Sequence, residues 1–573
     1  MQTRFKMARK VIFKPDKQNQ PDLFPSSFDE FVPKDHAVRI VNKIINDIDL
    51  TDILSTYKGG GASSFHPRVL LKILIYAYLN NVYSSRGIEK INRENVHFIW
   101  LNGRNFPDHN TINNFRSSRL KGRIDDVFTQ IVLLLNERGI ISFEKAFTDG
   151  TKIESTANRY TFVWRKKVEN NKARLEGKIK DVIAQIEEAI EDDSQTSSSK
   201  STEDCSGLTS EELQEDIKRL NQKLKEKGAS KKQFKKIENI EKKSLPKLIE
   251  YEGHLSILGQ RNSYSKTDHD ATFFRMKEDK MGNGELKPAY NFQLSTENNF
   301  ITNYSLHQSA GDTATFKEHL NFYKKKYGRY PDASIADAGY GSLENYRFLN
   351  DAYVDNYVKY NTFDKEGTKK FKTDISKVEN LFYNEEYDFF VCPMGQKMLP
   401  VGDEKRVTRL GEEYWSTRYQ AQDCSRCSLK GACHKQQGNR YSSVSKEIRR
   451  YRQQAKENLT SKEGKKLKKA RLSEVEQTFG QIKWNKGFKR FLLRGIDKIS
   501  IEIALLAIAH NIQKLGNLLA KTGGTMLFLE KLLVFCQKSG LSVNYSSILL
   551  LMNKDTSPKK AEKKILRQWK KAG

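Results

Sequence analysis

The chain has 573 residues, with 100 lysines and arginines against 71 aspartates and glutamates, so its formal net charge is +29. This excess predicts attraction to a polyanion, either nucleic acid or an acidic membrane surface. The sequence has no run of eighteen apolar residues and no apolar leader, so it predicts neither a transmembrane helix nor a secretory signal. Six cysteines are too few for a disulfide scaffold at this length. We expect a cytoplasmic protein that binds nucleic acid.

The N-terminal part is predicted to be helical. Residues 1–35 are polar and basic and suit an extended arm, whereas residues 36–125 show the apolar spacing of helices, with Pro67 well placed to start one. A turn and a basic helix follow in PDHNTINNFRSSRL, with candidate DNA-binding residues Asn113, Asn114, Arg116 and Arg119. This outline is typical of a helix-turn-helix domain, and an ordinary helical bundle with a solvated basic face explains it equally well.

The rest of the chain predicts an α/β core that is interrupted twice. Short apolar strands surround Asp149 and Asp337, and a hairpin is expected at residues 287–308. The predicted divisions are the first part of the core at 126–360, a helical hairpin inserted at about 160–260, a second insertion at 361–460, a closing helical segment at 461–520 and a basic tail at 521–573.

The order of these elements indicates how the core folds. Without the insertions it reads β-β-β-α-β-α-β-α, which is the ribonuclease H-like arrangement, a mixed sheet in which the first and fourth strands are parallel neighbours. Asp149 on the first strand and Asp337 at the end of the fourth should therefore lie close together. Glu476, on the closing helical segment, would reach them. We predict an α/β protein with this core and helical insertions, preceded by an all-helical domain.

Three carboxylates at one point repel each other unless cations lie between them. Carboxylate oxygens are natural ligands of Mg²⁺, and two such ions can assist an in-line phosphoryl displacement. Asp149, Asp337 and Glu476 are thus candidate catalytic residues that bind two Mg²⁺ or Mn²⁺ ions, with a nucleic-acid backbone as substrate. Each acid alone could be a helix cap or a surface charge, but the three in this strand order favour catalysis.

Several stretches resemble bacterial insertion-sequence transposases of the DDE class. FTDGTKIES, IADAGYGSLENY and VEQTFGQIKWNKGFKRFLLRG resemble the three acidic blocks of that family, and PDHNTINNFR resembles the end of its helical N-terminal domain. The matches span about residues 50–515. The resemblance implies that Asp149, Asp337 and Glu476 bind the metal ions, and that Lys483 contacts the end of the element.

The same resemblance implies a function. A protein of this class binds the ends of an insertion sequence, cleaves the DNA and joins the 3′ ends to target DNA. It would act as a homodimer assembled on DNA in the bacterial cytoplasm, associated with the nucleoid and with no membrane partner. A non-catalytic DNA-binding protein derived from a transposase, and a metal-dependent nuclease that does not join strands, are the alternatives.

The third acid has a rival in Glu474. The broader group often carries a Tyr and an Arg seven and four positions before the Glu, where this sequence has Lys469 and Leu472, with Arg471 one place off. Glu476 is preferred because Lys483 then lies about two helical turns further along the same face.

Other polar residues near these blocks are expected to have roles outside the metal site. Asp268 and Asp270 are expected to shape a turn, and Asp312 to cap a helix. Basic residues after Glu476 are candidate contacts to the DNA backbone, whereas Trp484, Phe488 and Phe491 among them are expected in the core. These basic residues are Lys483, Lys486, Lys489, Arg490 and Arg494.

Four cysteines gather in the second insertion, namely Cys392, Cys424, Cys427 and Cys433. Four thiolates suit a tetrahedral structural Zn²⁺ site. The spacing is not that of a standard zinc finger, His434 is a rival ligand, and free buried thiols are an equally good interpretation. Cys205 and Cys536 stand apart and have no predicted chemical role.

Overall fold

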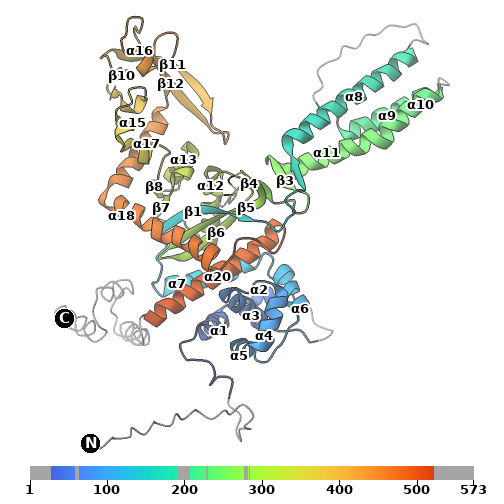
Figure 1. The fold of residues 1–573 in the computed structure, drawn as a ribbon, viewed down its shortest axis with the longest axis vertical. Coiled ribbons are helices and arrows are strands. Elements are labelled where there is room, and N and C mark those ends of the chain that lie inside the picture. The colour runs from blue at the N-terminus through green and yellow to red at the C-terminus, as the bar shows by residue number, and fades with distance from the viewer. Residues whose placement is uncertain are drawn as a thin grey trace, which may run out of the picture.

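The computed structural model describes residues 27–57, 63–191, 207–226, 230–276, 282 and 284–521. Most of the predicted N-terminal arm and almost all of the predicted basic tail lie outside these residues, as do Cys205 and Cys536. Two arms rise from a central sheet, and the N-terminal helices lie on the opposite side of it (Figure 1).

The N-terminal part is all-helical, as predicted. Its elements are α1 (Ala37–Asp47), α2 (Thr51–Leu54), α3 (Pro67–Leu79), α4 (Ser85–Glu94), α5 (Val96–Leu101), α6 (His109–Asn114), the π turn η1 (Phe115–Arg119) and α7 (Ile124–Glu137). Pro67 is the first residue of α3, where its missing N–H costs no hydrogen bond. The ring of His66 caps this helix by accepting a hydrogen bond from the main-chain N–H of Arg68.

The central sheet is mixed and has six strands. They are β1 (Lys145–Glu154), β4 (Thr272–Arg275), β5 (Leu286–Glu297), β6 (Phe300–His307), β7 (Ala333–Ala336) and β8 (Asp355–Val358). Their order is β4-β5-β1-β7-β8, and β6 also pairs with β5. Strand β1 runs antiparallel to β5 and parallel to β7, which in turn is parallel to β8. The predicted parallel pairing of the strands around Asp149 and Asp337 is therefore present.

The two faces of this sheet are chemically different. One face carries Phe147, Phe292 and Leu294, which join the main apolar core. The other face carries polar side chains, among them Thr148 and Ser295, which share a hydrogen bond of 2.9 Å. This polar face is covered by α12 (Phe316–Tyr327), and α13 (Leu343–Asp351) packs beside it against β8.

Helix α20 (Ile496–Lys521) joins the sheet to the N-terminal helices. It packs against β6 on one side and against α3 and α7 on the other, so one apolar core runs through both parts of the chain. Among the described residues, α20 alone is long and apolar enough to cross a membrane, and 61% of its most apolar window is buried inside the protein. It is the central core helix of this fold.

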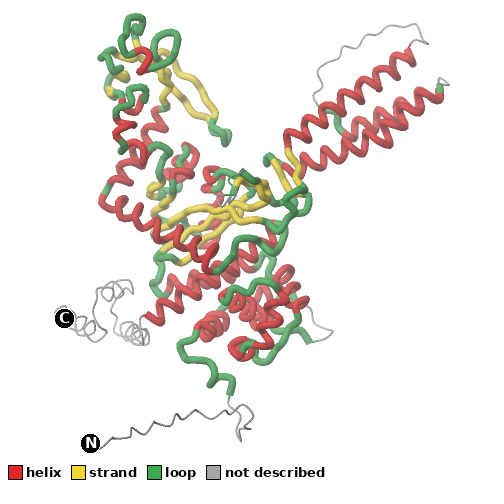
Figure 2. The backbone as a smooth tube through the Cα atoms, viewed as in Figure 1, coloured by secondary structure: helices red, strands yellow, loops and turns green. Residues whose placement is uncertain are grey.

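The first arm is a helical bundle (Figure 2). It contains α8 (Arg165–Glu191), α9 (Ser210–Glu226), α10 (Lys231–Asn239), the π turn η2 (Ile240–Ser244) and α11 (Leu245–Leu258), and the short strands β2 (Phe162–Trp164) and β3 (Ser263–Ser265) pair at its base. Its separate core includes Ile179, Ile186, Leu213 and Leu220, at the helical spacing seen in the sequence. The sequence predicted α8 and α9 but not the return through α10 and α11.

The second arm contains a five-stranded sheet of order β13-β12-β11-β10-β9. Its strands are β9 (Phe382–Asn384), β10 (Phe389–Val391), β11 (Lys397–Val407), β12 (Glu413–Ala421) and β13 (Tyr441–Val444). The short helices α14 (Phe363–Glu366) and α15 (Lys369–Lys372) lead into it, and α16 (Lys430–Cys433) lies between its last two strands. From the arm, α17 (Lys446–Thr460) and α18 (Lys462–Arg471) lead back to the central sheet, followed by η6 (Leu472–Glu476), α19 (Gln477–Gly480) and η7 (Gln481–Asn485).

Candidate active site

The three predicted acids come from three elements that meet where β7 ends beside β1, in the interior of the central sheet. Asp149 lies within β1, and Asp337 directly follows β7. Because β1 and β7 are parallel and pair Phe147 with Ile335, the two aspartates lie two residues beyond the same paired position. Glu476 is the last residue of the π turn η6, which packs against β1 and β5.

Arg471 lies between the three carboxylates. Its guanidinium is 3.3 Å from an oxygen of Asp149, 3.3 Å from one of Asp337 and 3.3 Å from one of Glu476. The arginine side chain is only 9% exposed, whereas those of Asp337 and Glu476 are 46% and 47% exposed. The acids are thus gathered around a buried positive charge and remain open to solvent on their other side.

A π turn explains how Arg471 reaches Glu476, which lies five positions later. Residues four apart share a face of an α-helix, whereas the i→i+5 bonds of a π turn bring residues five apart onto one face. The turn η6 begins directly after Arg471 and ends at Glu476. Arg471 is one position away from where the family usually has its arginine, but the π turn still brings it to face Glu476.

Glu474, the rival third acid, points elsewhere. Its carboxylate accepts hydrogen bonds from the main-chain N–H of Asn299 at 2.6 Å and from the hydroxyl of Thr296 at 3.3 Å. Asn298 and Asn299 form the β5–β6 turn and both have positive φ angles. Burial raises the pKa of Glu474. This glutamate holds the turn in place, and Glu476 is the one that lies with the aspartates.

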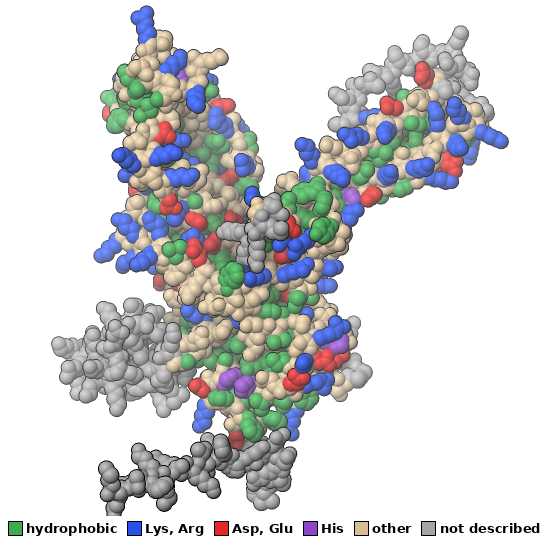
Figure 3. All heavy atoms as spheres, in the orientation of Figure 1, with side chains coloured by type: hydrophobic (Ala, Val, Ile, Leu, Met, Phe, Trp, Pro, Cys, Tyr) green, Lys and Arg blue, Asp and Glu red, His purple; other side chains and the backbone are tan. Residues whose placement is uncertain are grey.

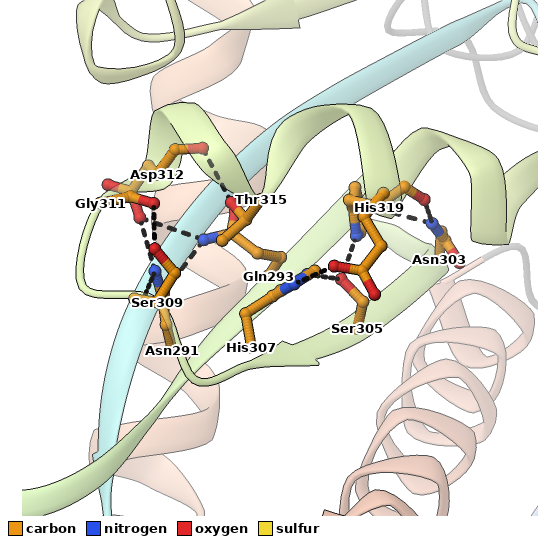
Figure 4. Close-up of polar contacts among 11 residues, drawn as sticks. Asn291, Gln293, Asn303, Ser305, His307, Ser309, Gly311, Asp312, Thr315 and His319 are labelled. Carbon is orange, nitrogen blue, oxygen red and sulfur yellow. Dashed lines mark hydrogen bonds and ion pairs between the residues drawn. The ribbon is translucent and has the colours of Figure 1, made fainter. Parts of the chain in front are cut away.

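A polar layer lies on the face of the sheet opposite to Asp149, and Figure 4 shows its residues Asn291, Gln293 and Asp312. Gln293 on β5 donates to Asn291 at 3.0 Å and to Asp312 at 3.1 Å, and it accepts a hydrogen bond from the hydroxyl of Tyr340. The predicted helix-cap role of Asp312 is wrong, because its carboxylate binds these amides and makes no capping bond. The burial of Tyr340, together with the nearby charge of Asp149, raises the pKa of its hydroxyl and keeps it neutral.

This layer predicts the effect of Gly150→Ala. A Cβ atom at this position would lie 2.2 Å from the Gln293 amide nitrogen. The amide cannot move without breaking its bonds to Asn291 and Asp312, so β1 would shift beside Asp149. We expect DNA cleavage to fall by up to about a hundredfold, since small displacements of reacting groups are costly. The control is Gly253→Ala in α11, where a Cβ would meet nothing within 4 Å, and it should cleave at the normal rate.

The donor set suits divalent cations, because hard ions prefer carboxylate oxygens. Among the residues that the structure describes, no group of three or more His, Cys, Asp or Glu side chains is close enough to hold a metal ion directly. At the site of the three acids, the Arg471 guanidinium takes the place of a cation between the carboxylates. A bound ion would need this side chain to withdraw.

Asp268 and Asp270 belong to the expected turn. Asp268 is buried and accepts hydrogen bonds from Ser155, from Tyr290 and from the main-chain N–H of Gly495. Asp270 accepts from the main-chain N–H of Ile496 at 2.9 Å. Both carboxylates thus anchor the start of α20.

The candidate DNA-binding helix of the N-terminal part is only partly exposed. Asn113 and Asn114 are exposed, but Arg116 is 3% exposed and donates to the main-chain oxygen of Tyr83 at 2.7 Å. Arg119 donates to the main-chain oxygen of Thr56, and its guanidinium lies over the ring of Tyr57. The prediction that Arg116 faces DNA is therefore wrong, because this side chain is part of the packed interior.

Arg116→Ala should destabilise the protein rather than weaken DNA binding alone. The change leaves the carbonyl of Tyr83 without its charged donor, and it removes positive charge near the buried Glu502. We expect a loss of about 2–4 kcal/mol in the free energy of unfolding, measured by thermal or denaturant melts. Asn113→Ala, on the same helical segment, should change stability by less than about 0.5 kcal/mol. Equal melting of the two variants would contradict the buried position of Arg116.

The basic segment after Glu476 divides into buried and exposed residues. Lys486 is 4% exposed, and its burial lowers the pKa of its amine to about 8, so the prediction that it contacts DNA is wrong. Phe488 and Phe491 lie in the core as predicted. Trp484 does not, because it is 65% exposed with the amine of Lys489 3.7 Å from its ring centre.

The remaining basic residues of this segment stay accessible. Lys483 is half-buried, whereas Lys489, Arg490 and Arg494 are exposed. Arg490 donates to the main-chain oxygen of Ser155 at 3.1 Å, so this loop lies beside the end of β1.

Sequence reasoning did not single out the lysines of α18. Helix α18 carries exposed lysines and ends at Arg471. The basic run KEGKKLKKAR in the sequence could have indicated this positive surface. Figure 3 shows Lys and Arg side chains gathered on this side of the molecule. The exposed residues are Lys462, Lys465, Lys466 and Lys469.

The four candidate zinc ligands lie in the second arm, distant in sequence from the acids. All four are free cysteines, and Cys424 and Cys433 are buried. Cys392, Cys424, Cys427 and Cys433 line one small cavity together with His434 and Arg440.

Two parts of the chain match known protein families. Residues 391–516 match a family described as "Transposase DDE domain", and residues 26–118 match one described as "Transposase domain (DUF772)". The first match includes Glu476, whereas Asp149 and Asp337 precede it. No curated protein and no solved structure matches the chain. The two family matches, which together cover less than half of the chain, confirm the resemblance to insertion-sequence transposases of the DDE class.

Proposed function

We propose that this transposase binds the ends of an insertion sequence, cleaves the DNA backbone and joins the 3′ ends to target DNA. The observation that carries the proposal is the meeting of Asp149, Asp337 and Glu476 around Arg471. The strand order and directions of the central sheet, with β1 beside and parallel to β7, support a ribonuclease H-like core.

The three carboxylates would hold two Mg²⁺ or Mn²⁺ ions. Such ions, when bound, activate the attacking oxygen and stabilise the leaving oxygen of a phosphodiester. The chain itself supplies the positions of the acids. Strands β1 and β7 fix the two aspartates, the π turn fixes Glu476, and the polar layer around Gln293 supports β1 from behind. The exposed sides of Asp337 and Glu476 leave room for a phosphate to approach.

Positive charge near the acids would hold the DNA. Lys483, Lys489, Arg490 and Arg494 follow Glu476, and the exposed lysines of α18 precede it. Asn113 and Asn114 are the exposed candidates in the N-terminal part. Phosphate contacts of this kind position DNA without reading its sequence. We propose that two copies assemble on DNA, one at each end of the element.

A strand-transfer assay tests this function. Purified protein is incubated in Mg²⁺ with labelled duplexes that carry the terminal repeats flanking the gene, together with a supercoiled target plasmid. The proposal predicts 3′-end cleavage, followed by covalent joining of the labelled strand to the plasmid. Cleavage without joined product would instead indicate a nuclease. Specific binding of the ends without cleavage in Mg²⁺ or Mn²⁺ would indicate a non-catalytic DNA-binding protein.

A further inference from the structure

The sheet of the second arm has a very small apolar core. The buried apolar side chains of this core are Phe390, Met398, Tyr419, Ala421 and Cys424. Small units with so little burial commonly depend on a metal ion or on disulfide bonds for their stability. The four cysteines of this arm are not paired as disulfides. A bound metal ion is therefore the way in which they could stabilise the sheet.

The cysteines approach the cavity from two separate parts of this arm. Cys392 lies in the turn between β10 and β11, and the other three lie in the connection between β12 and β13. The first turn is tight, because the N–H of Gly395 donates to the carbonyl of Cys392 at 2.9 Å and Gly395 has a positive φ of 81°. In the second part, the N–H of Cys427 donates to the carbonyl of Cys424 at 3.5 Å. Both turns present sulfur atoms to the same cavity.

Arg440 directs positive charge at these sulfurs. It is 2% exposed, and its guanidinium donates to the sulfur of Cys433 at 2.8 Å. Its main-chain N–H donates to the sulfur of Cys424 at 3.4 Å. Main-chain oxygens of Ile375 and Ser376 hold the guanidinium in place. Four thiolates around one divalent ion carry excess negative charge, and N–H donors to the ligand atoms are the usual outer layer of metal sites.

His434 lies beside the same cavity. Both of its ring nitrogens are buried, and neither has a hydrogen-bond partner among the described residues. Burial lowers the pKa of this imidazole. His434 is therefore the rival fourth ligand, but the donors from Arg440 single out Cys433.

We propose that Cys392, Cys424, Cys427 and Cys433 bind one structural Zn²⁺ ion that joins the β10–β11 turn to the β12–β13 connection. The sulfurs share a cavity but are not yet at ligand spacing, so binding draws them in to Zn–S distances of about 2.3 Å. The ion would order the tip of the second arm. This site is independent of the three acids and of the proposed function.

Metal analysis of the purified full chain tests the site. We expect about one equivalent of zinc per chain, released by a thiol-specific mercurial. After exchange with Co²⁺, the protein should show the intense near-ultraviolet charge-transfer band of cobalt–thiolate bonds. The catalytic ions proposed at the carboxylates give no such band, so the result does not depend on activity. Less than about half an equivalent of zinc after expression with added zinc, or Co²⁺ binding without this band, would overturn the proposal.

Single variants assign the ligands. Serine at Cys392, Cys424, Cys427 or Cys433 should reduce bound zinc to below half an equivalent, whereas Cys205→Ser, Cys536→Ser and His434→Asn should retain it. Zinc retained by Cys433→Ser but lost by His434→Asn would overturn the four-cysteine assignment. If the serine variants do not fold, the cobalt spectrum of the wild-type chain decides alone, because four thiolates give a stronger charge-transfer band than three.

Discussion

Asp149→Asn, Asp337→Asn and Glu476→Gln should each reduce DNA cleavage by about three orders of magnitude or more, with folding and DNA binding retained. Each substitution keeps the shape of the side chain but removes the charge that would hold a metal ion. The three variants should be similarly inactive, because residues that form one site fail as a unit. Single-turnover cleavage of an end-containing duplex in Mg²⁺ or Mn²⁺ measures the effect, and a chelator should abolish wild-type activity.

Glu474→Gln is the matched control for this series. It lies two residues from Glu476, but its side chain accepts hydrogen bonds from Asn299 and Thr296, which an amide oxygen can still accept. We expect cleavage within a few-fold of wild type. Activity of Glu476→Gln together with inactivity of Glu474→Gln would move the third acid to position 474. Cleavage by Asp149→Asn at the wild-type rate would refute the mechanism.

Arg471→Ala should make the stability of the protein depend on metal ions. Without metal, Arg471 is the positive charge that contacts all three carboxylates, and its removal leaves them to repel each other. Because the acids are partly exposed to solvent, we expect a loss of about 1–3 kcal/mol in chelator. Added Mg²⁺ or Mn²⁺ should restore much of this loss, since an ion that binds only the folded state stabilises it. Thermal melts with chelator and with millimolar metal measure both effects.

The control for Arg471 is Lys469→Ala, an exposed residue two positions earlier in α18. It should melt like the wild type in both conditions. In the wild type, metal ions must displace the guanidinium, so the rise in melting temperature with metal should be larger for Arg471→Ala. If Arg471→Ala melts at the wild-type temperature in chelator, the arginine does not hold the acids together.

The sequence predicted the parts of the site that follow from strand order. Apolar runs around Asp149 and Asp337 marked two strands, and the ribonuclease H-like order of elements predicted that these strands are parallel neighbours, as β1 and β7 are. The role of Arg471 could not be predicted in the same way. Its contact with Glu476 depends on a π turn, and no rule of helical periodicity indicates where an α-helix gains an extra residue.

Burial of charged residues was the other limit of the sequence. Arg116 and Lys486 lie in segments that read as basic surface, yet both are buried. The cause is α20, which lies between the N-terminal helices and the sheet and forms one core with both. Contacts between residues several hundred positions apart leave no local pattern. Trp484 shows the opposite error, because its aromatic ring was expected in the core but is exposed.

Anomalous X-ray scattering from crystals containing Mn²⁺ tests the central claim most directly. Our account predicts manganese peaks between the carboxylates of Asp149, Asp337 and Glu476, with the guanidinium of Arg471 withdrawn from its position among them. The peaks should be lost in crystals of Asp149→Asn. Manganese bound at Glu474, or no ion at the three acids in a crystal of the DNA complex that is active in solution, would contradict it.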